Sequence, residues 1–183
     1  MKILIAVASK HGSTREIAEA IGEELRAADH QTDLWDLVEG ERAAVDSVVA
    51  MGAGGSEGDV YDVASYDAVV AGSAIYMGRW MAEAREFVAE HAEQLQAVPV
   101  WLFSSGPLGE EYPEGMGVPE HLDDLLAQTE ARDHMVFVGR LDKSQLNLAE
   151  RLAVRMVKAP EGDYRDWDAI RDWARGIAAE VDG

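Results

Sequence analysis

The sequence predicts an α/β fold, a three-layer sandwich in which a five-stranded parallel sheet has helices on both faces. Short continuous apolar runs, such as residues 3–8, are typical of strands that are buried on both faces. Segments with apolar residues at helical spacing lie between these runs, and such alternation of strand and helix favours a parallel sheet. No linker, repeat or low-complexity tract interrupts the pattern, so residues 1–183 are predicted to form a single domain.

The first half of the chain contains three of the five predicted strands. Residues 3–8 are the first strand, and a helix over residues 14–28 follows it. Residues 31–37 alternate weakly between apolar and polar side chains and are predicted as the second strand. No element is assigned to residues 39–66, and the apolar run at residues 67–73 is the third strand. The apolar residues of the first helix recur at helical spacing: Ile17, Ala20, Ile21 and Leu25.

The rest of the chain, from residue 79 on, supplies the other two strands and four helices. Each predicted strand is again a short apolar run, and each helix has a periodic apolar face. The predicted elements are, in order, a helix at 79–95, a strand at 99–104, a glycine- and proline-rich loop at 106–119, a short helix near 120–129, a strand at 134–139, and helices near 144–157 and 166–180.

Composition excludes several classes of protein. Hydrophobic residues make up 48% of the 183 residues, which is enough for a full core. Cysteine is absent, which excludes disulfides, thiolate metal sites and a cysteine nucleophile. The formal charge of −19 argues against nucleic acid as a partner. The first apolar run is too short for a signal peptide, and no stretch approaches the roughly 20 apolar residues of a membrane span. We expect a cytoplasmic protein with no transmembrane segment, and peripheral contact with a membrane is the alternative.

The loop after the first strand has the composition of a phosphate site. Hydroxyl side chains and free backbone amides at the start of a helix bind anions, and the helix dipole favours negative charge there. A glycine in the loop lets the backbone approach a ligand closely. The candidate residues are Ser9, Lys10, His11, Gly12, Ser13 and Thr14.

The same loop is also compatible with a helix cap that binds no ligand. Ser13 and Glu16 have the spacing of a capping box. The loop lacks the sequence of a P-loop, and residues 52–58 do not match the dinucleotide-binding pattern of three spaced glycines. A phospho-acceptor receiver domain would need acidic residues where the chain has Ala8 and Ser9.

The loops after the third and fourth strands suit a flat ring. They combine small residues, hydroxyl groups and two aromatic rings, which favours stacking and backbone contacts with an isoalloxazine ring. Each loop alone is compatible with ordinary turns, but three such loops at one edge of the sheet indicate flavin mononucleotide (FMN). The candidate ring contacts are Ser73, Ala74, Ile75, Tyr76, Met77, Gly78 and Trp80 in one loop, and Ser104, Ser105, Gly106 and Pro107 in the other.

These motifs resemble those of the flavodoxin-like family. The similar stretches are residues 9–14, 72–80 and 103–109. Residues 137–142, 150–151, 155–157 and 162–167 resemble the branch that includes the menaquinone-dependent protoporphyrinogen IX dehydrogenases. The resemblance implies a flavodoxin-like sandwich with non-covalent FMN, the phosphate at the first loop and the ring between the later two.

The resemblance implies an FMN-dependent oxidoreductase that acts on a porphyrinogen-type substrate with a quinone or another electron acceptor. The alternative is a flavodoxin-type electron carrier that docks with a redox partner protein. The strand and helices at the carboxyl-terminal end favour the enzyme, whereas the acidic composition favours the carrier. The quinone-linked enzymes have basic residues where this chain has Tyr76-Met77 and Glu110-Glu111. No side chain is assigned as a catalytic acid or base, and no metal site is expected.

A local excess of basic residues lies between residues 140 and 158. Arg151, Arg155 and Lys158 share one face of the predicted helix. Cations near the carboxyl end of a helix can simply offset its dipole. The other interpretation is a docking face for an anionic substrate or a redox partner.

Overall fold

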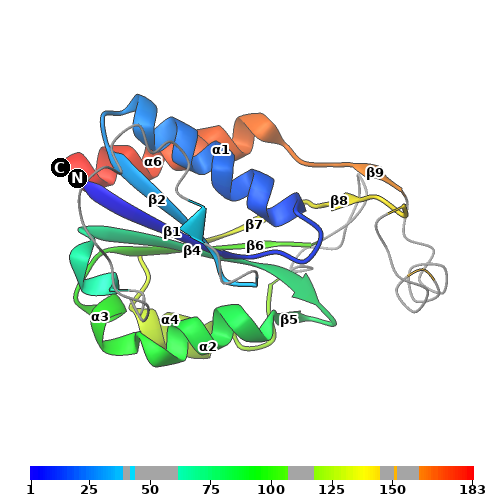
Figure 1. Ribbon diagram of the computed structural model, residues 1–183, viewed down its shortest axis with the longest axis horizontal. Coiled ribbons are helices and arrows are strands. Elements are labelled where there is room, and N and C mark those ends of the chain that lie inside the picture. Colours follow the sequence, from blue (N-terminus) through cyan, green and yellow to red (C-terminus); the bar gives the residue numbers. More distant parts are fainter. Residues whose placement is uncertain (39–41, 44–61, 107–117, 145–150, 152–160) are drawn as a thin grey trace.

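A computed structural model describes residues 1–38, 42–43, 62–106, 118–144, 151 and 161–183. A parallel five-stranded sheet forms its middle layer (Figure 1). The strands are β1 (Lys2–Ala8), β2 (Gln31–Asp36), β4 (Ala68–Tyr76), β6 (Val100–Ser105) and β7 (Asp133–Phe137). Their order in the sheet is β2-β1-β4-β6-β7, so the chain reverses direction across the sheet between β1 and β4. This confirms the five parallel strands that the sequence predicts.

Two short antiparallel strands extend this sheet beyond the prediction. β3 (Arg42–Ala43) pairs with the edge strand β2, and β5 (Arg79–Trp80) pairs with the end of β4. A single 3₁₀ turn, η1 (Val63–Ser65), precedes β4. The remainder of the unassigned stretch at 39–66 lies mostly outside the described residues.

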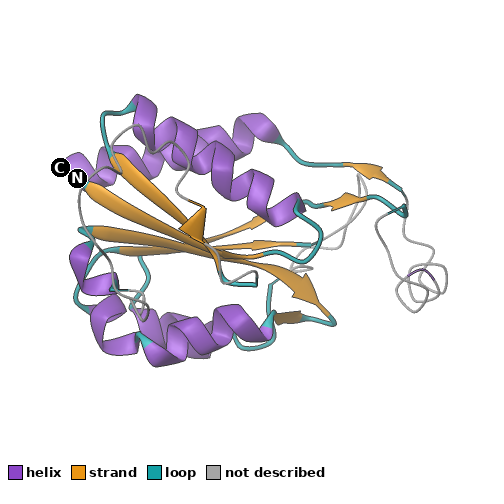
Figure 2. Ribbon diagram, in the orientation of Figure 1, coloured by secondary structure: helices purple, strands orange, loops and turns teal. Residues whose placement is uncertain are grey.

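Helices cover both faces of the sheet (Figure 2). Helices α1 (Ser13–Ala27) and α6 (Trp167–Asp182) lie on one face. Helices α2 (Ala82–Glu90), α3 (Ala92–Gln96) and α4 (Leu122–Thr129) lie on the other. No helix among the described residues is long and apolar enough to cross a membrane. The helix predicted near 144–157 lies outside the described residues, except for residues 144 and 151.

The predicted helix at 79–95 is wrong at its start. Met77 and Gly78 have φ angles of +50° and +79° and form the two-residue turn of a hairpin. Arg79 and Trp80 therefore pair back along β4, and α2 begins only at Ala82. A break at His91 then separates α2 from α3.

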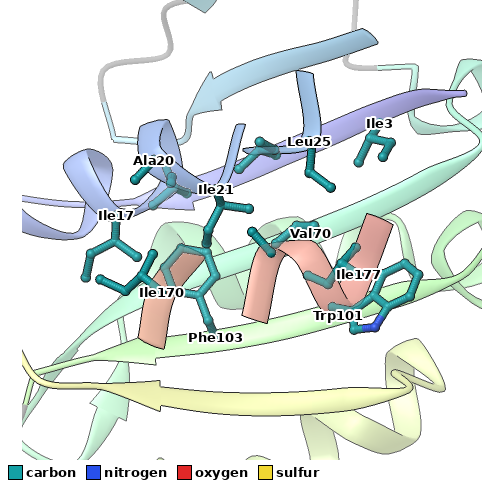
Figure 3. Close-up of a cluster of buried hydrophobic side chains, with 14 of the residues drawn as sticks. Ile3, Ile17, Ala20, Ile21, Leu25, Val70, Trp101, Phe103, Ile170 and Ile177 are labelled. Atoms are coloured by element: carbon teal, nitrogen blue, oxygen red, sulfur yellow. The ribbon is translucent and has the colours of Figure 1, made fainter. Parts of the chain in front are cut away.

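The core is divided by the sheet into two clusters. Successive residues of β1 point to opposite faces, so Ile5 packs beneath α1 and α6 while Leu4 packs beneath α2. This is why the strand is apolar at every position from Ile3 to Ala8. Figure 3 shows the α1–α6 cluster, in which side chains from both helices meet those of the central strands. Its labelled residues are Ile3, Ile17, Ala20, Ile21, Leu25, Val70, Trp101, Phe103, Ile170 and Ile177.

A second, two-stranded sheet lies at one end of the molecule. β8 (Arg140–Leu141) and β9 (Gly162–Asp163) pair in antiparallel fashion. They lie at the end where α1 begins, whereas the two chain termini lie together at the opposite end (Figure 1). Residues 161–166 therefore pass close to the amino-terminal end of α1 before α6 starts.

Candidate functional site

The register of the sheet brings the three candidate loops to one edge. Ala8 of β1 pairs with Ser73 of β4, and Ser73 pairs with Ser104 of β6. The carboxyl ends of β1, β4 and β6 are thus level with one another. The edge includes the reversal of strand order between β1 and β4, which is where α/β sheets bind ligands.

The first loop places hydroxyl groups around the beginning of α1. Ser9 and Thr14 are buried, Lys10 is exposed, and His11, Gly12 and Ser13 are partly buried. Gly12 has a φ of +77°, a conformation that favours glycine. A Cβ atom built on Gly12 would meet no atom within 4 Å, so this side of the loop is open. The first amides of an α-helix have no partners within the helix and can bind an anion here.

The capping-box interpretation of this loop is wrong. Gly12, not Ser13, is the residue that precedes α1, and no side chain caps the helix. The Ser13 hydroxyl instead accepts a hydrogen bond from the backbone N–H of Arg140 at 3.2 Å. The Glu16 carboxylate accepts hydrogen bonds from the Arg140 guanidinium.

Two arginines of the carboxyl-terminal part lie against this loop. Arg165 makes an ion pair of 2.7 Å with Glu16 and a two-point contact with Asp163. The hydrogen bond from Arg165 lowers the pKa of Asp163 below its ordinary value of 3.8. Burial disfavours the charged guanidinium, but its bonds to Asp163 and Glu16 outweigh burial and raise the pKa of Arg165. Arg165 therefore remains cationic beside the candidate phosphate loop.

The second loop is the hairpin between β4 and β5. The Ser73 hydroxyl is buried, donates to the carbonyl of Ala74 at 2.8 Å and accepts from the N–H of Met81 at 2.9 Å. Beyond it the chain becomes accessible: Ile75 is partly buried, whereas 40% of Tyr76 and 97% of Met77 is exposed. The hairpin presents two apolar side chains at the same edge as the first loop.

Glu120 fixes the base of this hairpin. Its backbone N–H donates to the carbonyl of Gly78 at 2.8 Å, and its carboxylate accepts from the Arg79 guanidinium at 2.9 Å. The hairpin is thereby joined to the segment that leads into α4.

Trp80 does not offer a ring face to a ligand, which corrects the sequence-based expectation. Its side chain is buried, and its indole N–H donates to the Ser104 hydroxyl at 2.8 Å. That hydroxyl lies 2.7 Å from Nε2 of His134. The indole can only donate, whereas the Ser104 hydroxyl can either donate to Nε2 or accept from it, depending on the tautomer of His134. Burial lowers the pKa of His134, which favours the neutral imidazole over the charged form, although Asp133 opposes the shift.

The third loop is described only at its beginning. Ser105 is buried and Gly106 is partly buried, with the Gly106 N–H 3.4 Å from the carbonyl of Phe137. A Cβ atom on Gly106 would lie 3.1 Å from Cβ of Ile75, so the second and third loops touch here. Pro107 lies outside the described residues.

The basic helix face predicted from sequence is described at one residue. Arg151 is exposed, and its guanidinium donates to the carbonyl of Ser144 at 3.4 Å. Arg155, Lys158 and the acidic pair Glu110-Glu111 lie outside the described residues. Within the described residues, no cluster of side chains suits a metal ion.

Sequence reasoning missed Arg165, Arg140 and His134 as neighbours of the candidate loops. Arg140 and Arg165 lie in carboxyl-terminal stretches that resemble one flavodoxin branch. The sequence therefore marks these stretches, but it does not predict that the two arginines contact the first loop. His134 had no signal, because its position follows from the register of β7 against β6.

The comparisons with known proteins agree with this geometry. Residues 54–168, more than half of the chain, match the family model described as "Flavodoxin domain". Protoporphyrinogen IX dehydrogenase [quinone] of Escherichia coli K12 is 24% identical over 196 residues, which cover 100% of this chain and 97% of that protein. A flavodoxin from the domain Archaea superimposes with a TM-score of 0.60 at 12% identity, covering 100% of both chains. A flavodoxin of Streptococcus pneumoniae TIGR4 gives 0.60 at 17% identity, covering 98% of this chain and 99% of that one. The chain belongs to the flavodoxin domain family.

Proposed function

We propose that this protein is an oxidoreductase that binds FMN non-covalently at the carboxyl edge of its sheet. Membership of the flavodoxin family implies a flavin. The observation that carries FMN in particular is the first loop, where Gly12 turns the chain at a φ of +77° into the start of α1. Only a flavin with a phosphate can use such an anion site.

The phosphate would be held by backbone amides and hydroxyl groups of the first loop. The space beside Gly12 is open, and Ser9 and Thr14 flank the turn. Lys10 is exposed next to it, so its ammonium group can approach a dianion from the solvent side. The proposed phosphate contacts are Ser9, Lys10, His11, Gly12, Ser13 and Thr14.

The flat ring would lie between the second and third loops. Tyr76 supplies an exposed aromatic face, and the contact between Gly106 and Ile75 brings the two loops together. When bound, the flavin supplies the transfer of electrons, and the protein orients it and sets the surrounding charge. The proposed ring contacts are Ser73, Ala74, Ile75, Tyr76, Met77, Gly78, Ser104, Ser105, Gly106 and Pro107. Trp80 is not a proposed ring contact, because its side chain is buried and its indole N–H donates to the Ser104 hydroxyl.

The proposed reaction is oxidation of a porphyrinogen-type substrate with a quinone as electron acceptor. Similarity over 97% of the length of the Escherichia coli enzyme supports it. The apolar hairpin tip at Met77 offers a surface that an aromatic substrate or quinone can contact. The second candidate function is an electron carrier, which the formal charge of −19 favours, since a strongly acidic surface steers basic partner proteins.

The cofactor is tested by titrating flavin-free protein with FMN and with riboflavin. We expect the wild-type protein to prefer FMN. Replacing Ser13 and Thr14 together with Ala should weaken FMN binding by about tenfold or more, because each hydroxyl bond to a dianion is worth roughly 1.5–3 kcal/mol. Riboflavin affinity should change little. Equal affinity of the wild-type protein for both flavins would contradict the phosphate site.

The reaction is tested by anaerobic assays of the FMN-loaded protein with protoporphyrinogen and a soluble menaquinone analogue. Formation of porphyrin that requires both protein and quinone supports the dehydrogenase. Heat-denatured protein with the same amount of free FMN is the control for non-enzymatic oxidation. Fast electron exchange with a flavodoxin reductase, without porphyrin formation, would instead establish the carrier.

A further inference from the structure

Arg165 is a buried cation whose bonds are almost fully satisfied. Its side chain is 2% exposed. Nε and Nη2 donate to the two carboxylate oxygens of Asp163 at 2.8 and 2.6 Å, and Nη1 lies 2.7 Å from Glu16 and 3.2 Å from the carbonyl of Ser13. The guanidinium also lies over the ring of Trp167, 4.4 Å from its centroid. A planar fork held at this many points has little freedom to move.

Two of these bonds go to the beginning of α1, which is far away in the chain: Ser13 and Arg165 are 152 positions apart. Ser13 is the first residue of α1, and Glu16 belongs to its first turn. Arg165 therefore holds the Ser13 carbonyl, which is part of the candidate phosphate loop, and the Glu16 carboxylate, which follows that loop in the first turn of α1. Arg140 adds a backbone bond to the Ser13 hydroxyl and a guanidinium bond to Glu16.

The charge of Glu16 makes this arrangement relevant to an anion. A carboxylate in the first turn of a helix interacts well with the helix dipole, but it repels a phosphate that binds at the same end. Arg165 and Arg140 both lie within ion-pair distance of Glu16, at 2.7 and 3.2 Å. Arg165 also pairs with Asp163 at 2.6 Å and Arg140 with Asp142 at 3.9 Å, so two cations are shared among three carboxylates. Loss of either arginine therefore leaves the charge of Glu16 less compensated.

We propose that Arg165 is a positioning residue for the phosphate end of the flavin. It does so by holding the first turn of α1 through Ser13 and by compensating the charge of Glu16. The inference rests on the proposed FMN site and adds to it the reason why the segment around β9 crosses to the first loop. Arg165 itself has no contact with the ligand in this role, because its donors are used within the protein.

The test compares the affinities of flavin-free variants for FMN and riboflavin, expressed as the ratio of the two dissociation constants. Arg165→Gln should reduce the preference for FMN by about tenfold, since coupled neighbours commonly contribute this much. Adding Glu16→Gln to that variant should restore part of the preference, because the uncompensated carboxylate is removed. The matched control is Arg175→Gln, an exposed arginine of α6 that also bonds to α1, through Glu24 at 3.1 Å. This control should keep the wild-type ratio.

Each result decides the matter. An unchanged ratio in folded Arg165→Gln overturns the positioning role. An equal loss of FMN preference in Arg175→Gln also overturns it, because any weakening of the contacts between α1 and α6 would then be enough to reduce the preference. A wild-type protein with no preference for FMN overturns the proposed phosphate site and this role together, so the two failures are distinguishable. If Arg165→Gln does not fold by circular dichroism, Arg165→Lys decides by the same ratio. Lysine keeps the charge without the fork, so a smaller loss is expected, and no loss overturns the role.

Discussion

Gly72 and Gly176 are the same residue type in opposite surroundings. Gly72 lies in the middle of β4, directly opposite Phe103 of β6. A Cβ atom at this position would lie 2.1 Å from two atoms of the Phe103 ring, so no side chain fits without moving that ring. Gly176 lies in α6, where a Cβ atom would meet nothing within 4 Å. The first glycine is required by packing, and the second is not.

Alanine at these two positions should therefore have effects of opposite sign on the free energy of unfolding. Gly72→Ala should destabilise the protein by about 1–3 kcal/mol, because it overfills the core beneath α1 and α6. Gly176→Ala should stabilise it by roughly 0.5–1 kcal/mol, because glycine inside a helix costs that much relative to alanine. Urea unfolding of the two variants measures both values. Two changes of the same sign would contradict the packing described for Phe103.

His134 should make the stability of the protein depend on pH. Burial lowers its pKa below 6.5, so near that value the unfolded chain binds more protons than the folded chain. This contribution to stability is complete above about pH 6.5 and is lost as the pH falls from there through the folded-state pKa. We expect the wild-type protein to lose more stability than His134→Gln between about pH 7 and pH 5, by at most about 1.4 kcal/mol per pH unit.

Ser104→Ala is the control for this pH effect, because it removes the hydrogen-bond partner and keeps the histidine. Its stability should still depend on pH over the same range. Parallel pH profiles for the wild-type protein and His134→Gln would show that His134 does not contribute.

At the scale of elements, the hairpin between β4 and β5 has an unusual turn residue. Two-residue hairpin turns with positive φ at both positions favour Asn-Gly, whereas this chain has Met77 and Gly78. A left-handed conformation costs a residue such as methionine about 1–2 kcal/mol, and Met77 recovers none of it by packing, since 97% of it is exposed. Strain of this kind is commonly retained where a side chain has a function.

Met77→Asn should raise the free energy of unfolding by about 1 kcal/mol. If Met77 contacts the substrate or the electron acceptor, the same variant should have a higher KM, so stability and activity should change in opposite directions. Val118→Asn is the matched control, because Val118 is also exposed but does not have a positive φ. It should not gain stability. A Met77→Asn variant that is no more stable than the wild type would contradict the turn described here.

Many of the helices and strands could be predicted from the sequence. The five parallel strands follow from apolar runs, because a strand covered on both faces has apolar residues at every position. The first loop is predicted at the correct end of β1, because the apolar run that marks this strand ends at Ala8. The hairpin was missed because Met77 gives no turn signal, and the apolar residues that follow it continue a helical pattern. The position of Trp80 could not be predicted either, since it depends on that hairpin.

At the scale of the whole molecule, the carboxyl-terminal part does not distinguish an enzyme from a carrier as simply as the sequence suggests. β7 is a strand of the central sheet, and α6 buries Ile170 and Ile177 against α1. These elements belong to the sandwich itself. Among the described residues, β8 and β9 are the elements that lie outside it, and they join the sandwich at the first loop through Arg140 and Arg165.

The bond between Arg165 and Ser13 also has a consequence for the order in which the protein is made. The ribosome produces the loop at residues 9–14 before Arg165, which follows Ser13 by 152 residues. The hydrophobic face of α1 also lacks its contacts with α6 until then, because α6 follows Arg165 in the chain. Long-range contacts of this kind form late, after the intervening chain has been synthesised. We therefore expect nascent chains that are arrested before residue 165 to retain no FMN, and flavin to enter only after this segment has left the ribosome.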